Sequence, residues 1–450
     1  MTWLKRLDAG SVRWLRIVWC DHAGLIRAKA AHRRLLDKGL PDGIGITVAQ
    51  QALPVMFDAV APDSGLGPIG EARLVPDWST LAVLPWAPGH AQVMGDMRVA
   101  GAPWEHCPRE YLRGQVRALA DAGFTARAAF ENEFFLLRRA GDRLLPADDT
   151  VYAATGGMNL HHAFVTELTA TLEALAMPPE FYYPESAPGQ QEISIGHAAP
   201  LDAADRQVTY REAVRGVAVR HGYVASFLPK IHESAAGSGC HLNFSLWGPG
   251  KRTGGKRGAG ENVMSDPRHA TGLSEVARRF IAGVLAHLPG LAALTVPSRN
   301  SYRRLLPHFW AGAFVVWGGD NREAAIRVTR APGGAARFEL KTCDATCNPY
   351  LALGALIAAG LDGVRRGLDL PAEVTVDPGY WSDDERRRRG IAPLPRSLGE
   401  ALDALAADKT LVESLGSARA RAYMAVKRME WEALRDLSLA DEVALLAERY

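Results

Sequence analysis

The sequence predicts an α+β protein with a small strand-rich N-terminal domain and a larger domain in which strands alternate with helices. Between residues 12 and 100, short apolar runs alternate with turns of glycine, proline and aspartate, a pattern typical of strands. Farther along, strand-like segments with polar residues at alternate positions are separated by segments of helical periodicity. At 450 residues the chain is too long for one ordinary core, so two domains or one large one are expected. The segment from Pro103 to Arg109 is the expected boundary between residues 1–103 and 104–450.

The helices of the larger domain are predicted from their apolar periodicity. YLRGQVRALADAG has a helical period and leads into a strand around Glu131. LSEVARRFIAGVLAHL predicts a second helix, and PYLALGALIAAGL, which begins at Pro349, predicts a buried one. The stretch from about residue 400 to residue 450 is expected to be helical as well.

Charge and composition exclude several classes of partner. The chain has 52 basic and 50 acidic residues, a formal charge of +2, which gives no reason to expect a nucleic-acid partner. Its longest apolar stretch falls short of the roughly 20 residues of a membrane span, so no membrane partner is expected. The start, MTWLKRLDAG, lacks a secretory signal, and the five cysteines show no paired spacing. A cytoplasmic location is therefore expected, with most cysteines acting as small buried hydrophobes.

One strand-like segment, GSGCHLNFSLW from Gly237 to Trp247, has polar side chains at every second position. His241, Asn243 and Ser245 would share one face of a strand, because successive side chains of a strand point to opposite sides. The other face would consist of apolar residues. The segment is therefore expected to present a row of polar ligands to a cavity and to anchor itself in a core.

Glutamates recur in three further segments of this kind. These glutamates are Glu131 and Glu133 in AAFENEFFLL, Glu185 and Glu192 in YYPESAPGQQEISIG, and Glu339 in RFELK, where it alternates with Arg337 and Lys341. A solvated strand face is the usual explanation of such a pattern, but it does not require the phenylalanines and leucines that flank it here. Clustered carboxylates repel one another and need cations. Oxygen-rich sites with one imidazole suit Mg²⁺ or Mn²⁺, and such ions commonly serve phosphate chemistry.

With these segments assembled, the chain resembles the glutamine synthetase family along nearly its whole length. The motifs that carry the resemblance are FENEFF, PESAPGQQE, SFLPK, GSGCHLNFS, PSRNSYRRLLP, WGGDNREAAIRV and RFELKTCDATCNPYLALGALIAAGLDG, in this order. The resemblance implies an N-terminal β-grasp domain and a catalytic domain with an antiparallel sheet backed by helices. It also implies ATP and two or three Mg²⁺ or Mn²⁺ ions in each site.

The resemblance also implies roles for individual residues. One metal ion would be held by Glu133, Glu185 and Glu192, and another by Glu131, His241 and Glu339. Nucleotide and phosphate contacts would come from Glu180, Asn243, Ser245, Arg322, Arg327 and Arg337. The amino-acid substrate would meet Gly237, Arg304 and Lys341, and catalysis would involve Arg304, Arg322, Lys341 and Trp310. Arginine suits these roles because its fixed fork matches carboxylate and phosphate oxygens.

The implied chemistry has two steps. ATP phosphorylates a carboxylate while divalent ions and arginines neutralise charge, and an amine then attacks the acyl phosphate and expels phosphate. The acid in this family is usually glutamate, and the active sites form between subunits of a ring, commonly a dodecamer. A homo-oligomeric ring acting on a small amino acid and an amine is therefore expected.

Three positions depart from the family pattern. The flap glutamate of ammonia-using members is replaced by Trp310, which offers an apolar wall or a cation-binding ring face to an organic amine. Lys341 replaces a usual arginine, and Ala236 stands where an asparagine often contacts glutamate. Asp58 is loosely matched to the ammonium-site aspartate. Tyr380 lies near a tyrosine that some bacterial members nucleotidylate, and an aromatic residue in a connecting loop is the simpler interpretation.

These departures favour a glutamate–amine ligase that makes a γ-glutamylamide from an organic amine. An ordinary glutamine synthetase is the first alternative, with Trp310 packing the flap while its catalytic role has moved elsewhere. A non-catalytic scaffold is the second alternative. The presence of all six expected metal ligands argues against the scaffold, because loss of function should remove some of them.

Overall fold

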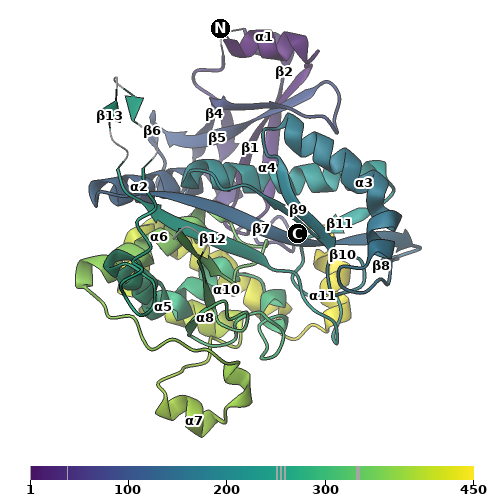
Figure 1. Ribbon diagram of the computed structural model, residues 1–450. Helices are drawn as coiled ribbons and strands as arrows, with labels where there is room; N and C mark the ends of the chain where they lie inside the picture. The colour runs from purple at the N-terminus through teal and green to yellow at the C-terminus, as the bar shows by residue number, and fades with distance from the viewer. Residues whose placement is uncertain (1, 38, 250–251, 254–255, 258–259, 331–334) are drawn as a thin grey trace.

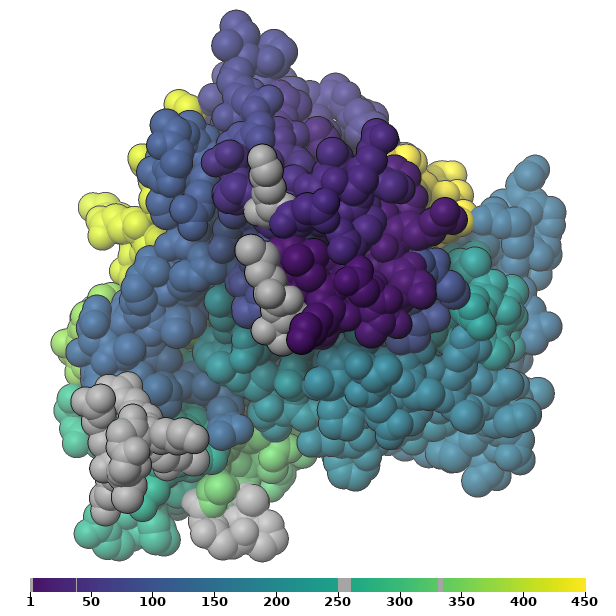
Figure 2. Space-filling model, turned by 90° about the horizontal axis from the view of Figure 1, so that it is seen from above, coloured from purple at the N-terminus to yellow at the C-terminus, as the bar shows by residue number. Residues whose placement is uncertain are grey.

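The computed structural model describes residues 2–37, 39–249, 252–253, 256–257, 260–330 and 335–450. A small N-terminal sheet lies above a long sheet that crosses the middle of the molecule (Figure 1). Seen from above, the N-terminal residues gather on one face and are bordered by residues of the larger domain (Figure 2). None of the described helices is long and apolar enough to cross a membrane.

The N-terminal sheet has the strand order β2-β1-β5-β4-β3, and β6 pairs with β5. The β1–β5 pair is parallel and the other pairs are antiparallel. The elements of this region are α1 (Thr2–Ala9), β1 (Trp14–Cys20), β2 (Ile26–His32), β3 (Ile44–Thr47), β4 (Glu71–Val83), β5 (His90–Val99), β6 (Ala102–Pro103) and the short 3₁₀ helices Arg33–Leu35 and Val48–Gln51. The strand-rich region predicted for residues 12–100 is confirmed.

Both faces of β1 are used, which explains why its sequence is almost continuously apolar. Leu15 and Ile17 pack into the core of the N-terminal domain. Val18 and Cys20 face the other way and belong to the core of the larger domain. Because alternate residues of a strand point to opposite sides, one strand joins the two cores.

The long sheet has the order β15-β16-β17-β12-β7-β10-β9, and β8 and β11 also pair with β7. Its strands are β7 (Thr125–Ala140), β8 (Arg143–Pro146), β9 (Pro179–Pro184), β10 (Gln190–Ile195), β11 (Val224–Ser226), β12 (Cys240–Trp247), β15 (Trp317–Gly319), β16 (Ile326–Arg330) and β17 (Ala336–Leu340), and a separate hairpin joins β13 (Arg252–Thr253) and β14 (Lys256–Arg257). The expected antiparallel sheet is confirmed, except that β15 and β16 run parallel.

The helices of the larger domain back this sheet. They are α2 (Pro108–Asp121), α3 (Thr155–Ala174), α4 (Pro200–Arg220), α5 (Glu275–Thr295), α6 (Pro349–Arg366), α7 (Asp383–Arg388), α8 (Leu398–Ala407), α9 (Lys409–Leu415), α10 (Ser417–Leu434) and α11 (Leu439–Leu446), with 3₁₀ helices at Asn300–Arg303 and Pro378–Tyr380. In Figure 1, α3 and α4 lie beside the N-terminal domain, α5 and α8 lie below the sheet, and α7 projects at the bottom.

The helix predicted at Pro349 is confirmed as α6, and its limits have clear causes. The Asn348 side chain accepts hydrogen bonds from the first backbone N–H groups, and Gly367 ends the helix in a left-handed conformation (φ 65°). A Cβ on Gly283 of α5 would lie 2.3 Å from the Ala359 carbonyl oxygen, so glycine is needed where α5 and α6 cross. All five cysteines are buried, as expected.

Arg109 forms ion pairs with both the N-terminal domain and the larger domain. The buried Arg109 guanidinium at the start of α2 contacts Asp77 of β4 at 2.8 Å, Asp96 of β5 at 2.7 Å and Asp205 of α4 at 2.8 Å. A buried cation is tolerated when it is paired and hydrogen-bonded in this way. The chain leaves the small sheet at Pro103 and enters α2 close to this contact.

Candidate active site

Strands β7, β12 and β17 lie side by side and place the polar residues of the three motifs opposite one another. His241 pairs in register with Glu131, and Asn243 pairs with Glu339. The residues between them, such as Leu242 and Phe244, are buried in the core on the other face. The alternation predicted for residues 240–247 is thus confirmed, and the polar faces of three strands form one surface.

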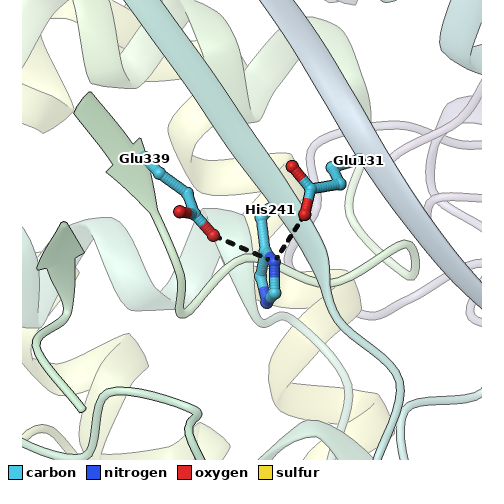
Figure 3. A group of neighbouring side chains, drawn as sticks. All are labelled: Glu131, His241 and Glu339. Atoms are coloured by element: carbon cyan, nitrogen blue, oxygen red, sulfur yellow. Dashed lines mark ion pairs between the residues drawn. The ribbon is translucent and has the colours of Figure 1, made fainter. Parts of the chain in front are cut away.

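Glu131, His241 and Glu339 form a tight cluster on this surface (Figure 3). They offer one ligand atom each, and these atoms lie within 4.8 Å of one another. His241 Nδ1 lies 3.0 Å from Glu339 Oε1 and 3.6 Å from Glu131 Oε1. This nitrogen is buried and has no hydrogen-bond partner among the described residues. Two carboxylates that converge on one imidazole nitrogen are a donor set that suits a divalent cation.

Cationic side chains surround Glu339. Lys341 Nζ lies 3.4 Å and Arg327 Nη1 3.1 Å from its oxygens. Although burial opposes ionisation, Lys341, His241 and Arg327 hold the pKa of Glu339 below its usual range. Burial and Lys341 oppose protonation of His241, but Glu131 and Glu339 outweigh them and raise its pKa to about 9.

Glu133, Glu185 and Glu192 line the same cavity from the neighbouring strands. Glu192 of β10 pairs in register with Glu133 of β7. Burial and Glu133 raise the pKa of Glu185 to about 7, and burial with Glu131 and Glu133 raises the pKa of Glu192 to about 9. His241, whose Nε2 lies 3.7 Å from Glu133 Oε1, offsets only part of the repulsion among these carboxylates. Among the described residues, Glu131, His241 and Glu339 are the only group of three whose ligand atoms all lie within 4.8 Å of one another. The side chains of Glu133, Glu185 and Glu192 are therefore less closely grouped.

The cavity has a volume of about 310 Å³. The predicted site residues that line it are Glu131, Glu133, Glu185, Glu192, Gly237, His241, Arg304, Trp310, Arg322, Glu339 and Lys341. Ala236 lines it too. A Cβ on Gly237 would lie 2.5 Å from the Pro229 carbonyl oxygen, so only glycine fits this wall.

The other predicted residues lie outside the cavity wall. Asn243 donates to Glu131 Oε2 at 3.1 Å and accepts from Arg337 Nε at 3.0 Å, which continues the polar row along β12. Ser245, farther along, accepts a hydrogen bond from Trp247. Glu180 is exposed at the start of β9. Asp58 is also exposed, with 86% of its side chain accessible, and does not line the cavity.

Arg304 is buried beside His241 and is held by the main chain. It donates to the carbonyl oxygens of Thr342 at 2.9 Å and Lys341 at 2.8 Å. These bonds fix the guanidinium at the cavity wall, and the fork geometry of arginine makes it suitable for a carboxylate. Lys341 lies within the same wall and is itself buried.

The flap, defined as residues 307–312, forms the mouth of the cavity. Its Trp310 is 58% exposed, and the Arg322 guanidinium lies 5.9 Å from the centre of a Trp310 ring. The ring of His308 lies 4.8 Å from the ring of Tyr380, and Tyr380 is exposed at the end of the 3₁₀ helix Pro378–Tyr380.

Five aromatic or polar residues of the wall were not predicted: Tyr152, Tyr183, Ser186, His308 and Phe309. Tyr183 could have been found, because it stands two residues before Glu185 and pairs in register with Glu192. Tyr152 lies in a loop that carries no periodic signal.

Comparisons with known proteins agree along the whole chain. Family models of the glutamine synthetase N-terminal domain and catalytic domain match residues 3–104 and 105–445. The γ-glutamylpolyamine synthetase GlnA3 of Streptomyces coelicolor is 36% identical over 436 residues, covering 94% of this chain and 90% of that protein. A glutamine synthetase of Halobacterium salinarum is 34% identical over 438 residues, covering 95% and 92%. A solved glutamine synthase homologue has a TM-score of 0.84 at 33% identity, covering 98% and 99%.

Fold, site and relatives define an ATP-dependent ligase that forms C–N bonds. Within that class, the chain belongs to the glutamine synthetase family. The resemblance based on the seven motifs is confirmed, as is the fold that it implied.

Proposed function

We propose that this protein phosphorylates the side-chain carboxylate of glutamate with ATP and couples it to an organic amine, giving a γ-glutamylamide. The observation that carries the proposal is Trp310 at the mouth of an acidic cavity, in the place of the flap glutamate expected for an ammonia-using enzyme. Tyr152, Tyr183 and Phe309 share the cavity wall with it. Aromatic ring faces bind alkyl groups and organic cations. The glutamate carboxylate that Trp310 replaces would instead favour binding of ammonium.

Two groups of side chains are assigned to divalent cations. Glu131, His241 and Glu339 would hold one ion, and the grouping of their ligand atoms within 4.8 Å of one another supports this assignment. Glu133, Glu185 and Glu192 would hold a second, and their mutual repulsion favours a cation between them. Such ions neutralise charge on the transferring phosphoryl group.

The remaining polar residues are assigned to the two substrates. Arg304, Gly237 and Lys341 would hold glutamate, because Arg304 is fixed by main-chain carbonyls at the cavity wall. The set assigned to ATP and its phosphates is Glu180, Asn243, Ser245, Arg322, Arg327 and Arg337. Arg327 and Arg337 are oriented in advance by hydrogen bonds to Glu339 and Asn243, so they would stabilise charge on phosphate oxygens with little movement.

In the second step the neutral amine attacks the acyl carbon of γ-glutamyl phosphate. The C–N bond forms, the C–O bond to phosphate breaks, and one amine proton leaves with the phosphate. The flap residues would contribute by excluding water and by packing on the organic part of the amine. The name of the Streptomyces coelicolor relative, a γ-glutamylpolyamine synthetase, supports an amine acceptor.

An ordinary glutamine synthetase is the alternative, and it is favoured by relatives that carry that name, such as the one from Halobacterium salinarum. Phosphate release and amide formation with glutamate, ATP and Mg²⁺ decide between the two. The acceptors should include ammonium, alkylamines, aromatic amines, hydroxylated amines and polyamines. Turnover with at least one organic amine should exceed turnover with ammonium, and the opposite order excludes the proposal.

We also propose that the protein forms a homo-oligomeric ring. Mass photometry, which measures the mass of the assembly, tests this proposal.

A further inference from the structure

The flap holds its shape against backbone strain. His308 and Trp310, on either side of Phe309, both have left-handed conformations with φ values of 68° and 56°. Residues with a Cβ rarely adopt this region, and such conformations persist only where the surroundings enforce them. Something outside the flap must therefore hold these two residues.

A carboxylate outside the flap contacts each of the strained residues. Glu323 Oε1 accepts the backbone N–H of Trp310 at 2.9 Å. The Asp377 carboxylate contacts His308 Nδ1 at 2.6 Å. Glu323 is only 7% exposed, so little water competes for its hydrogen bond.

The turn that carries Glu323 is itself fixed to the protein body. Asn321 Oδ1 accepts the Glu323 backbone N–H at 3.0 Å, and Asn321 Nδ2 donates to the carbonyl oxygens of Val374 and Val376. The preceding residue, Arg322, lines the cavity and faces the Trp310 ring. One turn therefore contacts Trp310 twice, through the main chain by Glu323 and through the ring by Arg322.

We propose that Glu323 is a positioning residue that fixes the Trp310 wall over the cavity, so that the acyl phosphate meets the acceptor and not water. The inference rests on the proposed function, because it assigns the acceptor wall to the flap. Glu323 is not among the residues that line the cavity. It acts through the Trp310 main chain.

Loss of this hydrogen bond should loosen the flap and admit water. Attack by water consumes the acyl phosphate and one water molecule, breaks its C–O bond, and yields glutamate, hydrogen phosphate and one proton. The measurable sign is phosphate released without amide. A role in folding alone would lower both products together and leave their ratio unchanged.

The test compares Glu323→Ala, Glu323→Asp and Glu323→Gln with the wild type in the full-length protein. Glutamine keeps an acceptor oxygen at the same reach, aspartate retracts it, and alanine removes it. Glu373→Ala is the matched control, because Glu373 Oε1 accepts the Gly319 backbone N–H at 2.7 Å and no described hydrogen bond joins Glu373 to the flap. Amide and phosphate are measured together, with KM values for acceptor, glutamate and ATP and a melting curve for each variant.

Glu323→Ala should raise the acceptor KM by about 3- to 10-fold and lower the amide-to-phosphate ratio, as expected for one hydrogen bond. Glu323→Asp should do the same more weakly, and it decides the question if the alanine variant does not fold. Glu323→Gln and Glu373→Ala should keep the wild-type ratio. An unchanged ratio in the alanine and aspartate variants, or an equal loss in the glutamine variant, overturns the inference.

The ratio is measured with the best organic amine and separately with ammonium. If ammonium proves to be the natural acceptor, the proposed function fails, but uncoupling in the Glu323 variants with ammonium still supports the positioning role. If the organic amine is preferred and no variant uncouples, only the positioning role fails.

Discussion

Replacing Glu192 by glutamine should stabilise the metal-free protein while it removes activity. Burial and the carboxylates of Glu131 and Glu133 raise the pKa of Glu192 from 4.5 to about 9. At pH 7 the folded protein therefore retains a proton that the unfolded chain has lost. At about 1.4 kcal/mol for each tenfold change in proton affinity, the interval from 4.5 to pH 7 costs the folded state about 3 kcal/mol. An amide does not ionise, so the Glu192→Gln variant avoids this cost.

The sign of the pH dependence follows from proton binding. Between about pH 4.5 and pH 9 the folded wild type binds more protons than the unfolded chain, so its stability falls as the pH rises. The advantage of the variant should be absent near pH 4.5 and grow until about pH 9. The entropy of unfolding scales with chain length, so 3 kcal/mol corresponds to about 3 °C in melting temperature for a chain of this size.

The assay is thermal melting in EDTA at several pH values, followed by melting in excess Mg²⁺. Excess ligand at about 100 times its Kd stabilises a folded protein by about 2.7 kcal/mol, and the wild type should gain more from Mg²⁺ than the Glu192→Gln variant. Glu173→Gln, at an exposed position on α3, is the control and should melt like the wild type at every pH. Phosphate release by Glu192→Gln should be lost.

Two results would refute the reasoning. One is a Glu192→Gln variant that melts at or below the wild-type temperature in EDTA at pH 8. The other is an advantage that is as large at pH 5 as at pH 8, because the stabilisation would then have nothing to do with ionisation of the carboxyl group.

Three further changes test other parts of the site and fold. Trp310→Ala should raise the KM for the organic amine by about 3- to 30-fold in steady-state kinetics, the range of a lost ring–cation contact; an unchanged KM would remove Trp310 from the acceptor site. Glu339→Ala should abolish phosphate release, because it removes one of three clustered donors and leaves His241 Nδ1 without its nearest carboxylate; unchanged turnover would discredit the metal assignment. His287→Asn tests a buried ion cluster: although burial opposes protonation, Asp408 at 2.6 Å and Asp362 at 3.0 Å raise the pKa of His287 above 6.5. The stabilisation that protonated His287 gives is complete below pH 6.5 and is lost as the pH rises through the pKa of His287 in the folded protein. The melting temperature of the wild type should therefore fall more steeply above pH 6.5 than that of the His287→Asn variant.

Elements defined by local patterns were predictable from the sequence. The helix at Pro349 has a capping asparagine, a proline at its first position and an uninterrupted apolar run, all of which are local signals. The pairing of β12 between β7 and β17 joins segments about a hundred residues apart, and no local pattern specifies it. The parallel β15–β16 pair depends on the same kind of long-range packing.

Individual residues show a similar division within the site. The resemblance to the glutamine synthetase family grouped Glu131, His241 and Glu339, and the structure brings them together. The contact of Glu323 with the flap could not be predicted, because it depends on the direction of a main-chain N–H in a strained turn. Side-chain alternation carries information about strand faces, but it carries none about such loops.

The site is divided between two kinds of scaffold, and this division bears on how the family can diversify. The cluster of Glu131, His241 and Glu339 is fixed by strand register, so a shift of one residue would turn its side chains into the core. Trp310 and Phe309 stand on a short loop, where a side chain can change without altering a strand register. Under the proposed function, new acceptors would arise by changes in a few loop residues, while the strand residues proposed to bind the metal ion are inherited intact.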